Sequence, residues 1–405
     1  MNKGVDNISL AIKNRLLANQ NIKDSASNEI NENVLEKSDT KNKKKKSKRI
    51  FYFDALRALA ILAVISFHCS TRMQPLILST KASGFNLHWL FGDFFFAGMI
   101  IGVDIFLMLS GALSLGREWS IRSFLGRRIP RIVAPFLFWG FVLMAAVLFL
   151  QYQYPGLLHA TNSFNIPDIV SYMISAFKGD GYGFGPYWFF WMILGTYLIM
   201  PVLNKWLLHS DLREAEYFLA IWLVACLFEN TLGYTFPVKI SYFSGPIGMV
   251  VLGYYLRHTK RKIFDNKIVP IVLIIIGLSC LLYGSYILSV DDMYKFSRYS
   301  IFNVLEVTGI FLLFRNCADV NFGALSKPDN IVRKAISSIA KYSYGFYLIH
   351  GTILDVFKSA LIYTNSYNGY ITLFLKSFIL ALGLSWLLMA LLNRVPYINQ
   401  IIGAK

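Results

Sequence analysis

Apolar residues in this chain are grouped into long runs that are separated by short polar segments. Most runs contain close to 20 residues, which is the length that a helix needs to cross the hydrocarbon core of a bilayer. Apolar and polar residues do not alternate within the runs, so a β-barrel is not predicted. The pattern predicts an all-α, polytopic integral membrane protein with about ten transmembrane helices, at residues 51–71, 94–115, 131–151, 187–208, 215–233, 242–257, 267–289, 298–316, 338–361 and 370–393.

The first run contains ionisable side chains, which are costly inside a membrane and mark function by default. Arg57 and His68 stand 11 positions apart (57 to 68). At about 100° per residue they share one helix face, with a rise of about 16 Å between them, close to half the hydrocarbon thickness. A lone histidine in a span is more often bonded to a neighbouring helix. The arginine on the same face favours a functional role, and we expect Asp54 to support Arg57.

Residues 1–48 are rich in Asn, Lys, Ser and Asp and have no sustained apolar periodicity, so we expect a disordered cytoplasmic tail. The tail ends in the basic run KNKKKKSKR, which suits contact with anionic lipid headgroups. Much of the remaining net charge of +17 lies in segments 117–130, 258–267 and 317–337, which alternate with segments poorer in Lys and Arg. This bias predicts that both termini lie in the cytoplasm, and it is not a signal for nucleic-acid binding.

The composition agrees with a membrane protein, because 55% of the residues are hydrophobic and only 16% are charged, less than in a soluble domain. The four cysteines, Cys69, Cys226, Cys280 and Cys317, lie in or beside apolar runs without a close pair. We interpret them as packing residues rather than as a disulfide framework or a metal site. The first long apolar run begins near residue 51 and is too long for a signal peptide, so none is predicted.

Five segments resemble sequence signatures of one family of membrane enzymes. LRALAILAVISFH resembles the Arg-x10-His signature that opens the acyltransferase-3 family of membrane O-acyltransferases. Further signatures of that family are matched, in the same order, by GVDIFLMLSGAL (102–113), FLGRRIPRIVAPF (124–136), YWFFWMILGTYLIMPVL (187–203) and YSYGFYLIHGTIL (342–354). The resemblance covers roughly residues 51–393. It implies an acyltransferase-3 transmembrane domain at 49–396, between the tail and a short cytoplasmic C-terminus at 397–405.

The resemblance implies an enzyme of the bacterial inner membrane that transfers an acetyl or other short acyl group from cytoplasmic acyl-CoA to a hydroxyl group. The implied acceptor is a cell-envelope polysaccharide or its lipid-linked precursor. Acetyl-CoA is then a donor substrate, and we expect neither a permanently bound cofactor nor a metal. The other expected partners are membrane lipids.

Three residues are assigned to catalysis. His68 is the candidate general base, because a neutral imidazole can take the proton from an attacking sugar hydroxyl. Asp104 matches an aspartate of the family and can either orient His68 or pair with an arginine. Glu306 lies deep in its run without a cation on its own helix, so we expect a partner on another helix, with His68 as one option. For His350, a structural hydrogen bond to a neighbouring helix is at least as compatible with the sequence as catalysis.

Arg57, Arg128 and Arg131 are assigned to donor binding. Arg57 lies at the predicted cytoplasmic edge, and the other two match the family's Arg-x-x-Arg segment. Guanidinium groups suit the phosphate oxygens of acyl-CoA. Charge that only sets the topology would explain such a cluster equally well. The resemblance favours donor binding.

The main alternative is a membrane transporter or exporter of polysaccharide intermediates, which would also combine about ten spans with buried charges. Transporters usually contain internal repeats with broken helices at corresponding positions, and we find no convincing repeat. The face shared by Arg57 and His68 has no role in such a protein. The Gly- and aromatic-rich segment 179–188, in the predicted outward loop 152–186, fits either a rim that stacks on sugars or an interfacial aromatic belt.

Overall fold

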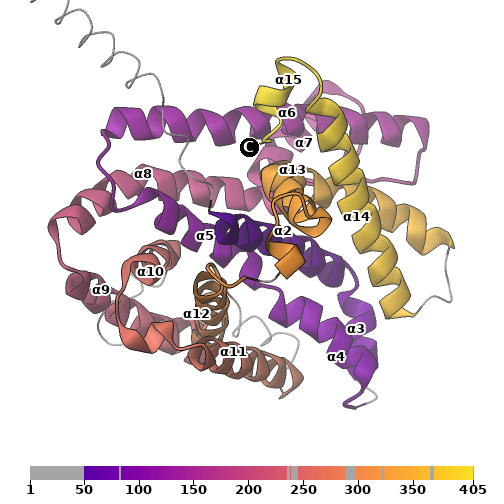
Figure 1. Ribbon diagram of the computed structural model, residues 1–405. Coiled ribbons are helices and arrows are strands. Elements are labelled where there is room, and N and C mark those ends of the chain that lie inside the picture. Colours follow the sequence, from indigo (N-terminus) through magenta and orange to yellow (C-terminus); the bar gives the residue numbers. More distant parts are fainter. Residues whose placement is uncertain are drawn as a thin grey trace, which may run out of the picture. The chain divides into compact units, whose positions relative to one another are not determined.

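The structure is a computed structural model that describes residues 50–81, 84–234, 238, 245–287, 298–321, 323–364 and 369–404. The predicted tail, residues 1–48, lies outside the described residues. Every regular element within the described ranges is a helix, so the predicted all-α class is confirmed. Figure 1 shows these helices gathered into one bundle between residues 51 and 405.

Seven helices in the described ranges are long and apolar enough to cross a membrane: Phe51–Arg72, Leu87–Ser114, Ile121–Gln153, Gly185–His209, Leu212–Leu232, Ile268–Ile287 and Tyr370–Leu392. This confirms a polytopic membrane protein. The other three predicted spans also form helices, α10 (Pro246–His258), α12 (Ile301–Asn316) and α13 (Ile331–Thr364). These three are not among the seven, and α10 and α12 have only 13 and 16 residues. The count of ten spans therefore stays a prediction.

The helix α2 (Phe51–Arg72) lies at the centre of the bundle. It packs against α5 (Ile101–Ser114), α12, α13 and α14 (Tyr370–Leu392), as Figure 1 shows. Its apolar side chains Leu56, Ile61 and Ile65 are fully buried. Arg57 and His68 thus belong to one continuous helix, as predicted, and this helix is enclosed by others over most of its length.

Glycines bring α5 unusually close to its neighbours. A Cβ atom on Gly102 would lie 2.6 Å from the carbonyl oxygen of Ala60 on α2. A Cβ atom on Gly253 of α10 would lie 2.0 Å from the carbonyl oxygen of Met108 on α5. Small residues allow helix backbones to approach in this way, which maximises van der Waals contact where no hydrophobic effect drives association. The three helices α2, α5 and α10 are therefore held at fixed distances.

The helix α6 begins earlier than predicted. It spans Ile121–Gln153, so most of the predicted loop 117–130 is helical. The Ser120 side chain caps it by accepting from the Ser123 backbone N–H at 3.2 Å. The sequence did not show this start because the first turns are basic rather than apolar. Pro130, the last residue of the predicted loop, lies within the helix.

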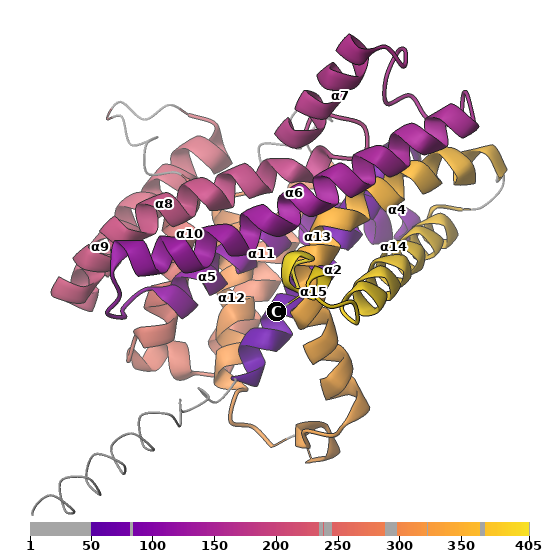
Figure 2. The ribbon, with the colours of Figure 1, turned by 90° about the horizontal axis from the view of Figure 1, so that it is seen from above.

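A further helix lies in the predicted outward loop 152–186. It is α7 (Ile166–Lys178), capped by Asn165 and ended by Gly179 in a left-handed conformation, φ 94°. Figure 2 shows α6 beside α8 (Trp188–His209), with α7 beyond them at the edge of the molecule. At 13 residues α7 is too short to register as a span, which is why the run-length pattern missed it.

The remaining helical elements are short segments or partners of these helices. They are α3 (Gln74–Lys81), α4 (Leu87–Asp93), the π-helix η1 (Phe94–Gly98), η2 (Gly185–Tyr187), α9 (Leu212–Ala225), the π-helix η3 (Cys226–Leu232), η5 (Lys262–Asp265), α11 (Ile268–Ile287), η7 (Gly323–Ser326) and α15 (Ile398–Ile401). The π-helical turns form the start of the predicted span 94–115 and the last part of the predicted span 215–233. Such turns are frequent near functional sites.

The C-terminal residues pack against the bundle. Ile402 is fully buried, and its carbonyl oxygen accepts a hydrogen bond from the Trp139 indole N–H of α6 at 3.0 Å. Tyr344 of α13 donates its hydroxyl hydrogen to the Ile132 carbonyl of α6 at 2.8 Å. The chain from α15 to residue 404 therefore closes over α6 and α13.

One end of the bundle is rich in arginine. Arg257 of α10 stacks over the ring of Phe53, 5.2 Å from its centroid, and donates to the Ala112 carbonyl of α5. Arg333 of α13 stacks over Phe51 at 3.9 Å. These contacts place the first turns of α2 and α13 beside the last turns of α5 and α10. We call this the basic end, defined by Arg57, Arg117, Arg122, Arg128, Arg257, Arg315 and Arg333.

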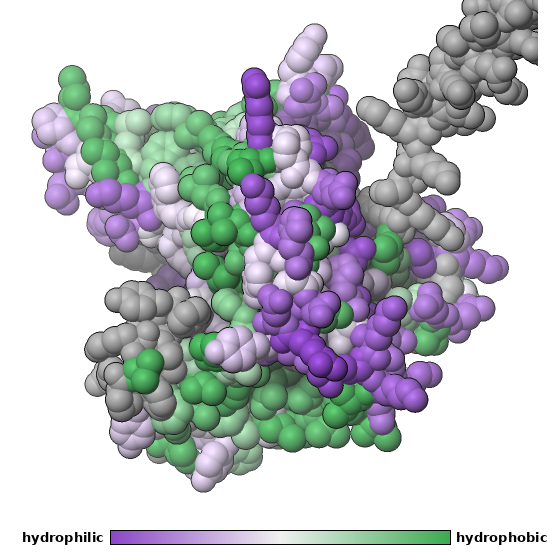
Figure 3. Space-filling model, turned by 90° about the vertical axis from the view of Figure 1, so that its left-hand side faces the viewer, coloured by the Kyte–Doolittle hydropathy of each residue, from purple (hydrophilic) through white to green (hydrophobic). Residues whose placement is uncertain are grey.

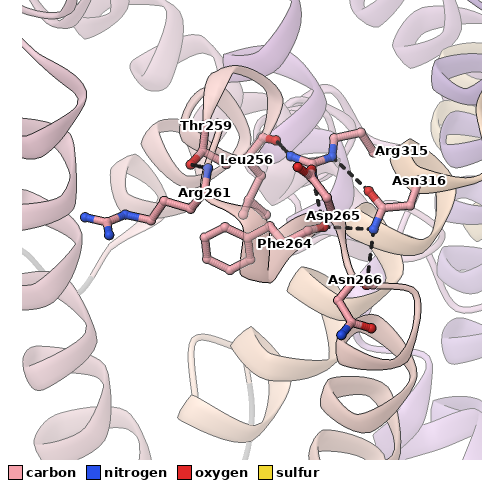
Figure 4. A network of polar contacts seen from close by, with 8 residues as sticks. All are labelled: Leu256, Thr259, Arg261, Phe264, Asp265, Asn266, Arg315 and Asn316. Carbon is pink, nitrogen blue, oxygen red and sulfur yellow. Dashed lines mark hydrogen bonds and ion pairs between the residues drawn. The ribbon is translucent and has the colours of Figure 1, made fainter.

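A network of polar contacts fastens the segment before α11 to the basic end (Figure 4). Arg315 of α12 donates to the carbonyl oxygens of Leu256 and Phe264, at 2.6 and 2.8 Å, and pairs with Asp265 at 2.9 Å. Asn316 also donates to the Phe264 carbonyl.

Figure 3 views the side of the molecule on which the α8–α9 turn lies, where hydrophilic residues gather beside broad hydrophobic areas. The predicted cytoplasmic segments 117–130 and 258–267 thus meet at the same end.

Candidate active site

A small cavity opens beside His68 at the opposite end of α2. Its volume is about 40 Å³, which is enough for a few water molecules. Side chains from α2, α5, α8 and α13 and from the turns before α5, α8 and α12 line it: Val64, Phe67, His68, Met99, Ile100, Val103, Pro186, Trp188, Phe189, Arg298 and Tyr347. We call it the histidine cavity. Its wall is largely apolar and aromatic, with one imidazole and one guanidinium group.

A second histidine lies next to His68. The rings of His68 and His350 have centroids 5.2 Å apart, with a tilt of 45° between their planes. His350 lies on α13 and is fully buried. Its Nδ1 is 2.9 Å from the Phe346 carbonyl oxygen on the same helix. The sequence left open a structural bond to a neighbouring helix or catalysis for this residue. The structure instead shows a bond within α13, together with proximity to His68.

Arg298 faces the same cavity from the residues just before α12. Its guanidinium carbon lies 4.2 Å from the centroid of the Trp188 ring, a cation–π contact. Its Nε is buried and has no hydrogen-bond partner among the described residues. The group interacts electrostatically with both His68 and Asp104. The sequence pattern did not single out this arginine, whose only signal was a cation at the start of an apolar run.

The end of α2 is held to α13 by Arg72. Its Nε lies 2.5 Å from a carboxylate oxygen of Asp355, and its Nη2 donates to the Gly351 carbonyl at 3.1 Å. Its Nη1 donates to the His68 carbonyl at 3.0 Å. These bonds fix the turn of α2 that carries His68 against the helix that carries His350. In the sequence, Arg72 counted only as a charge of an outward loop.

The segment 179–188 packs on α13 rather than extending into solvent. Tyr182 donates its hydroxyl hydrogen to the Asp355 carbonyl at 2.7 Å, and Thr352 donates to the Gly183 carbonyl at 2.9 Å. Tyr347 donates to the carbonyl of Pro186, which lines the histidine cavity. The segment therefore forms part of the cavity wall, through Pro186 and Trp188. Its interpretation as a rim that stacks on sugars stays a prediction.

The two predicted catalytic carboxylates lie outside the cavity lining. Asp104 is fully buried on α5, and its Oδ2 accepts from the Asn303 amide of α12 at 2.6 Å. Its link to the cavity is electrostatic, through Arg298. Glu306 is buried where α12 packs on Gly277 of α11, and its Oε2 has no hydrogen-bond partner in the described part of the chain. The structure therefore brings Asp104 near the site and leaves Glu306 apart from it.

The three predicted donor-binding arginines lie at or beside the basic end. Arg57 is 3.4 Å from a carboxylate oxygen of Asp54, as expected, and 29% of its side chain is exposed. Arg128 donates to the Ser114 hydroxyl of α5 at 2.8 Å. Arg131 is exposed one turn later on α6. The histidine cavity ends at Val64 on α2 and does not reach Arg57.

A larger cavity, of about 800 Å³, opens at the basic end. It is lined by residues at the start of α6 and the end of α8: Glu118, Trp119, Ser120, Ile121, Arg122, Pro201, Asn204, Lys205 and Leu208. The buried Asn204 holds the two parts together by accepting from the Gly116 N–H and donating to the Arg117 carbonyl, both at 2.9 Å. Arg128 and Arg131 are not among the lining residues.

Most of the chain matches one protein family. The family described as "Acyltransferase domain" matches residues 50–390, which include every helix around the histidine cavity. The chain belongs to the acyltransferase-3 family. Comparisons with curated proteins and with solved structures gave no match. The resemblance found over residues 51–393 is thus confirmed, and as an acyltransferase-3 member this chain is a multi-pass membrane acyltransferase.

Proposed function

We propose that this acyltransferase transfers an acetyl or other short acyl group from acyl-CoA to a hydroxyl of a cell-envelope polysaccharide or its lipid-linked precursor. The proposal places the basic end in the cytoplasm of a bacterial inner membrane and the histidine cavity toward the outer side. The observation that carries it is His68 in a cavity opposite Arg298, within an acyltransferase domain. A base and a cation on one cavity are the two groups that acyl transfer requires.

The reaction starts when His68 takes the proton of the acceptor hydroxyl. The hydroxyl oxygen attacks the carbonyl carbon of the thioester, and a C–O bond forms. The tetrahedral intermediate then collapses, the C–S bond breaks, and the proton on His68 passes to the departing thiolate. The products are the O-acyl ester and free CoA. A positioned general base of this kind contributes about 10²–10⁴-fold to a rate.

Arg298 stabilises the developing oxyanion in this proposal. Negative charge develops on the thioester oxygen in the transition state, and a positioned donor in a water-poor site stabilises it strongly. The Nε–H of Arg298 is buried without a hydrogen-bond partner among the described residues, so it is available for that oxygen. Stacking on Trp188 holds the guanidinium group in place without using its hydrogen-bond donors. Asp104 supports this cation electrostatically.

The donor's phosphates bind at the basic end, to Arg57, Arg128 and Arg131. Guanidinium groups are suited to phosphate because they donate two parallel hydrogen bonds. Since the histidine cavity ends at Val64, the acyl arm reaches His68 only when α2 and its neighbours part between Arg57 and Val64. The rise between Arg57 and His68 is about 16 Å along the helix, which the pantetheine arm of CoA can span.

The test is transfer of radiolabel from [¹⁴C]acetyl-CoA to material extracted from isolated membranes that contain the protein. We expect wild type to label a glycolipid or polysaccharide fraction, and His68→Ala to lose at least about 99% of that rate. The exposed His159 provides the control, His159→Ala, which should keep the rate. Equal labelling by wild type and His68→Ala, at equal protein amounts, would contradict the proposal. An exporter of polysaccharide intermediates predicts no labelling by any of the three.

A further inference from the structure

His350 has a hydrogen-bonding atom for which the fold supplies no use. Its Nδ1 lies 2.9 Å from the Phe346 carbonyl oxygen, and a carbonyl oxygen only accepts hydrogen bonds. Nδ1 therefore carries the proton in the neutral ring, and Nε2 is a bare acceptor. This Nε2 is buried and has no hydrogen-bond partner among the described residues. Most buried polar atoms are bonded, so an unused acceptor requires an explanation.

The nearest ionisable ring is that of the proposed base. The His68 and His350 centroids are 5.2 Å apart. As placed, the two rings are not hydrogen-bonded to each other. Imidazole nitrogens lie about 1.1 Å from the ring centre, so a rotation that turns one nitrogen of the His68 ring toward Nε2 would bring the two nitrogens about 3 Å apart, a hydrogen-bond distance. Arg72 bonds both α2 and α13 beside these two rings, and so holds them at this spacing.

His68 needs such a partner. A general base acts through one ring nitrogen, and a hydrogen bond at the other nitrogen selects the tautomer and the ring orientation. The predicted orienting carboxylates do not fill this role, because Asp104 is bonded to Asn303 and Glu306 lies against α11. The ring of Phe67, which meets His68 edge-on at 5.2 Å, offers packing but no acceptor.

We propose that His350 is the positioning residue for His68. Its Nε2 accepts a hydrogen bond from a ring N–H of His68, which leaves the other His68 nitrogen unprotonated toward the histidine cavity. The inference rests on the proposed function of His68 as the base. His350 itself touches neither the acceptor nor the donor in this scheme, and the proton of the acceptor hydroxyl stays on His68 until the thiolate leaves.

Two substitutions separate this role from a purely structural one. His350→Asn keeps an amide N–H near the position of Nδ1, so it preserves the bond to the Phe346 carbonyl but removes the acceptor at Nε2. His350→Gln extends one bond further and places an amide oxygen near the position of Nε2. We expect His350→Asn to lower kcat for label transfer from [¹⁴C]acetyl-CoA by about tenfold or more, with KM for acetyl-CoA within about twofold of wild type. We expect His350→Gln to restore kcat to within about threefold of wild type.

The opposite ranking overturns the inference. If His350→Asn matches wild type, or if both variants lose kcat equally, the acceptor at Nε2 has no role. The thermal unfolding midpoint and the amount of protein in the membrane are measured alongside, so that a loss caused by misfolding is recognised. A wild type that transfers no label would instead overturn the proposed function.

A measurement on the wild type covers the case in which the variants do not fold. In ¹⁵N-histidine-labelled protein in lipid, solid-state NMR distinguishes protonated from bare ring nitrogens. We expect His350 with Nδ1 protonated and Nε2 bare and hydrogen-bonded, and His68 in a single tautomer. A mixture of His68 tautomers in the wild type would overturn the inference.

Discussion

The contact between Gly102 and Ala60 allows a quantitative test of how packing supports the site. A Cβ atom at position 102 would lie 2.6 Å from the Ala60 carbonyl oxygen, whereas ordinary contacts begin at 3.4 Å. Gly102→Ala therefore has to move α2 and α5 apart by about 0.8 Å, because a backbone oxygen cannot rotate away. Overpacking of this kind destabilises a protein by roughly 1–3 kcal/mol.

The same displacement reaches the histidine cavity. Val64, whose Cγ2 would lie 2.7 Å from the new Cβ, and Val103 next to Gly102 both line that cavity. A misplacement of about 1 Å can lower a catalysed rate by roughly 10²-fold. We therefore expect Gly102→Ala to reduce label transfer by at least about tenfold and to lower the unfolding midpoint relative to a variant that gains the same methyl group without a clash.

A matched control separates the clash from the change in helix propensity. A methyl group on Gly195 of α8 would have no heavy atom within 4 Å, so Gly195→Ala adds the same group to open space. Both variants gain about 1 kcal/mol of helix propensity, and the difference between their unfolding free energies measures the contact at Gly102 alone. Thermal unfolding in detergent and label transfer in membranes are the two assays. If the two variants behave alike in both assays, the close approach of α2 and α5 does not support the site.

Four further outcomes are expected. Arg298→Lys should lower kcat for label transfer by about 10²-fold, because it removes the Nε–H donor, and an unchanged kcat would exclude the arginine from oxyanion stabilisation. Arg72→Gln should lower the free energy of unfolding by roughly 1–3 kcal/mol, because it removes the ion pair that joins α2 to Asp355 of α13; an unchanged midpoint in detergent would refute this. Arg131→Ala should weaken binding of CoA to the purified protein, whereas Arg127→Ala, at an exposed residue that donates to Ser123 of its own helix, should not; equal affinities would argue against donor binding at position 131. Arg315→Met should increase amide hydrogen exchange in the segment before α11, because its bonds to two carbonyls are lost, and unchanged exchange would show that other contacts hold the segment.

The central helix of the fold was predictable because the length of its apolar run determines its bounds. The apolar run after Ile50 gave α2 with nearly its observed bounds, and with it the common helix of Arg57 and His68. The start of α6 was not predictable from the same pattern, since its basic first turns look like a loop. The helix α7 was missed for a related reason, because 13 residues cannot form a span.

The composition of the site was less accessible to sequence reasoning. His68 stood out as a polar residue in an apolar run, but Arg298 lies at the edge of its run, where a cation carries no special signal. Its position opposite His68 depends on how α12 packs beside α5, which no local pattern encodes. Asp104 was predicted with two alternative partners, and the structure gives it the amide of Asn303 and the field of Arg298.

The bond between Trp139 and Ile402 has a consequence for biosynthesis. The indole N–H belongs to α6, which leaves the ribosome long before the residue that accepts its hydrogen bond. Until Ile402 has been synthesised, this donor stays without its native acceptor. We therefore expect the contact between Trp139 and Ile402 to form late in assembly, so that a variant cut off before Ile398 inserts into the membrane but leaves this part of α6 without its native packing.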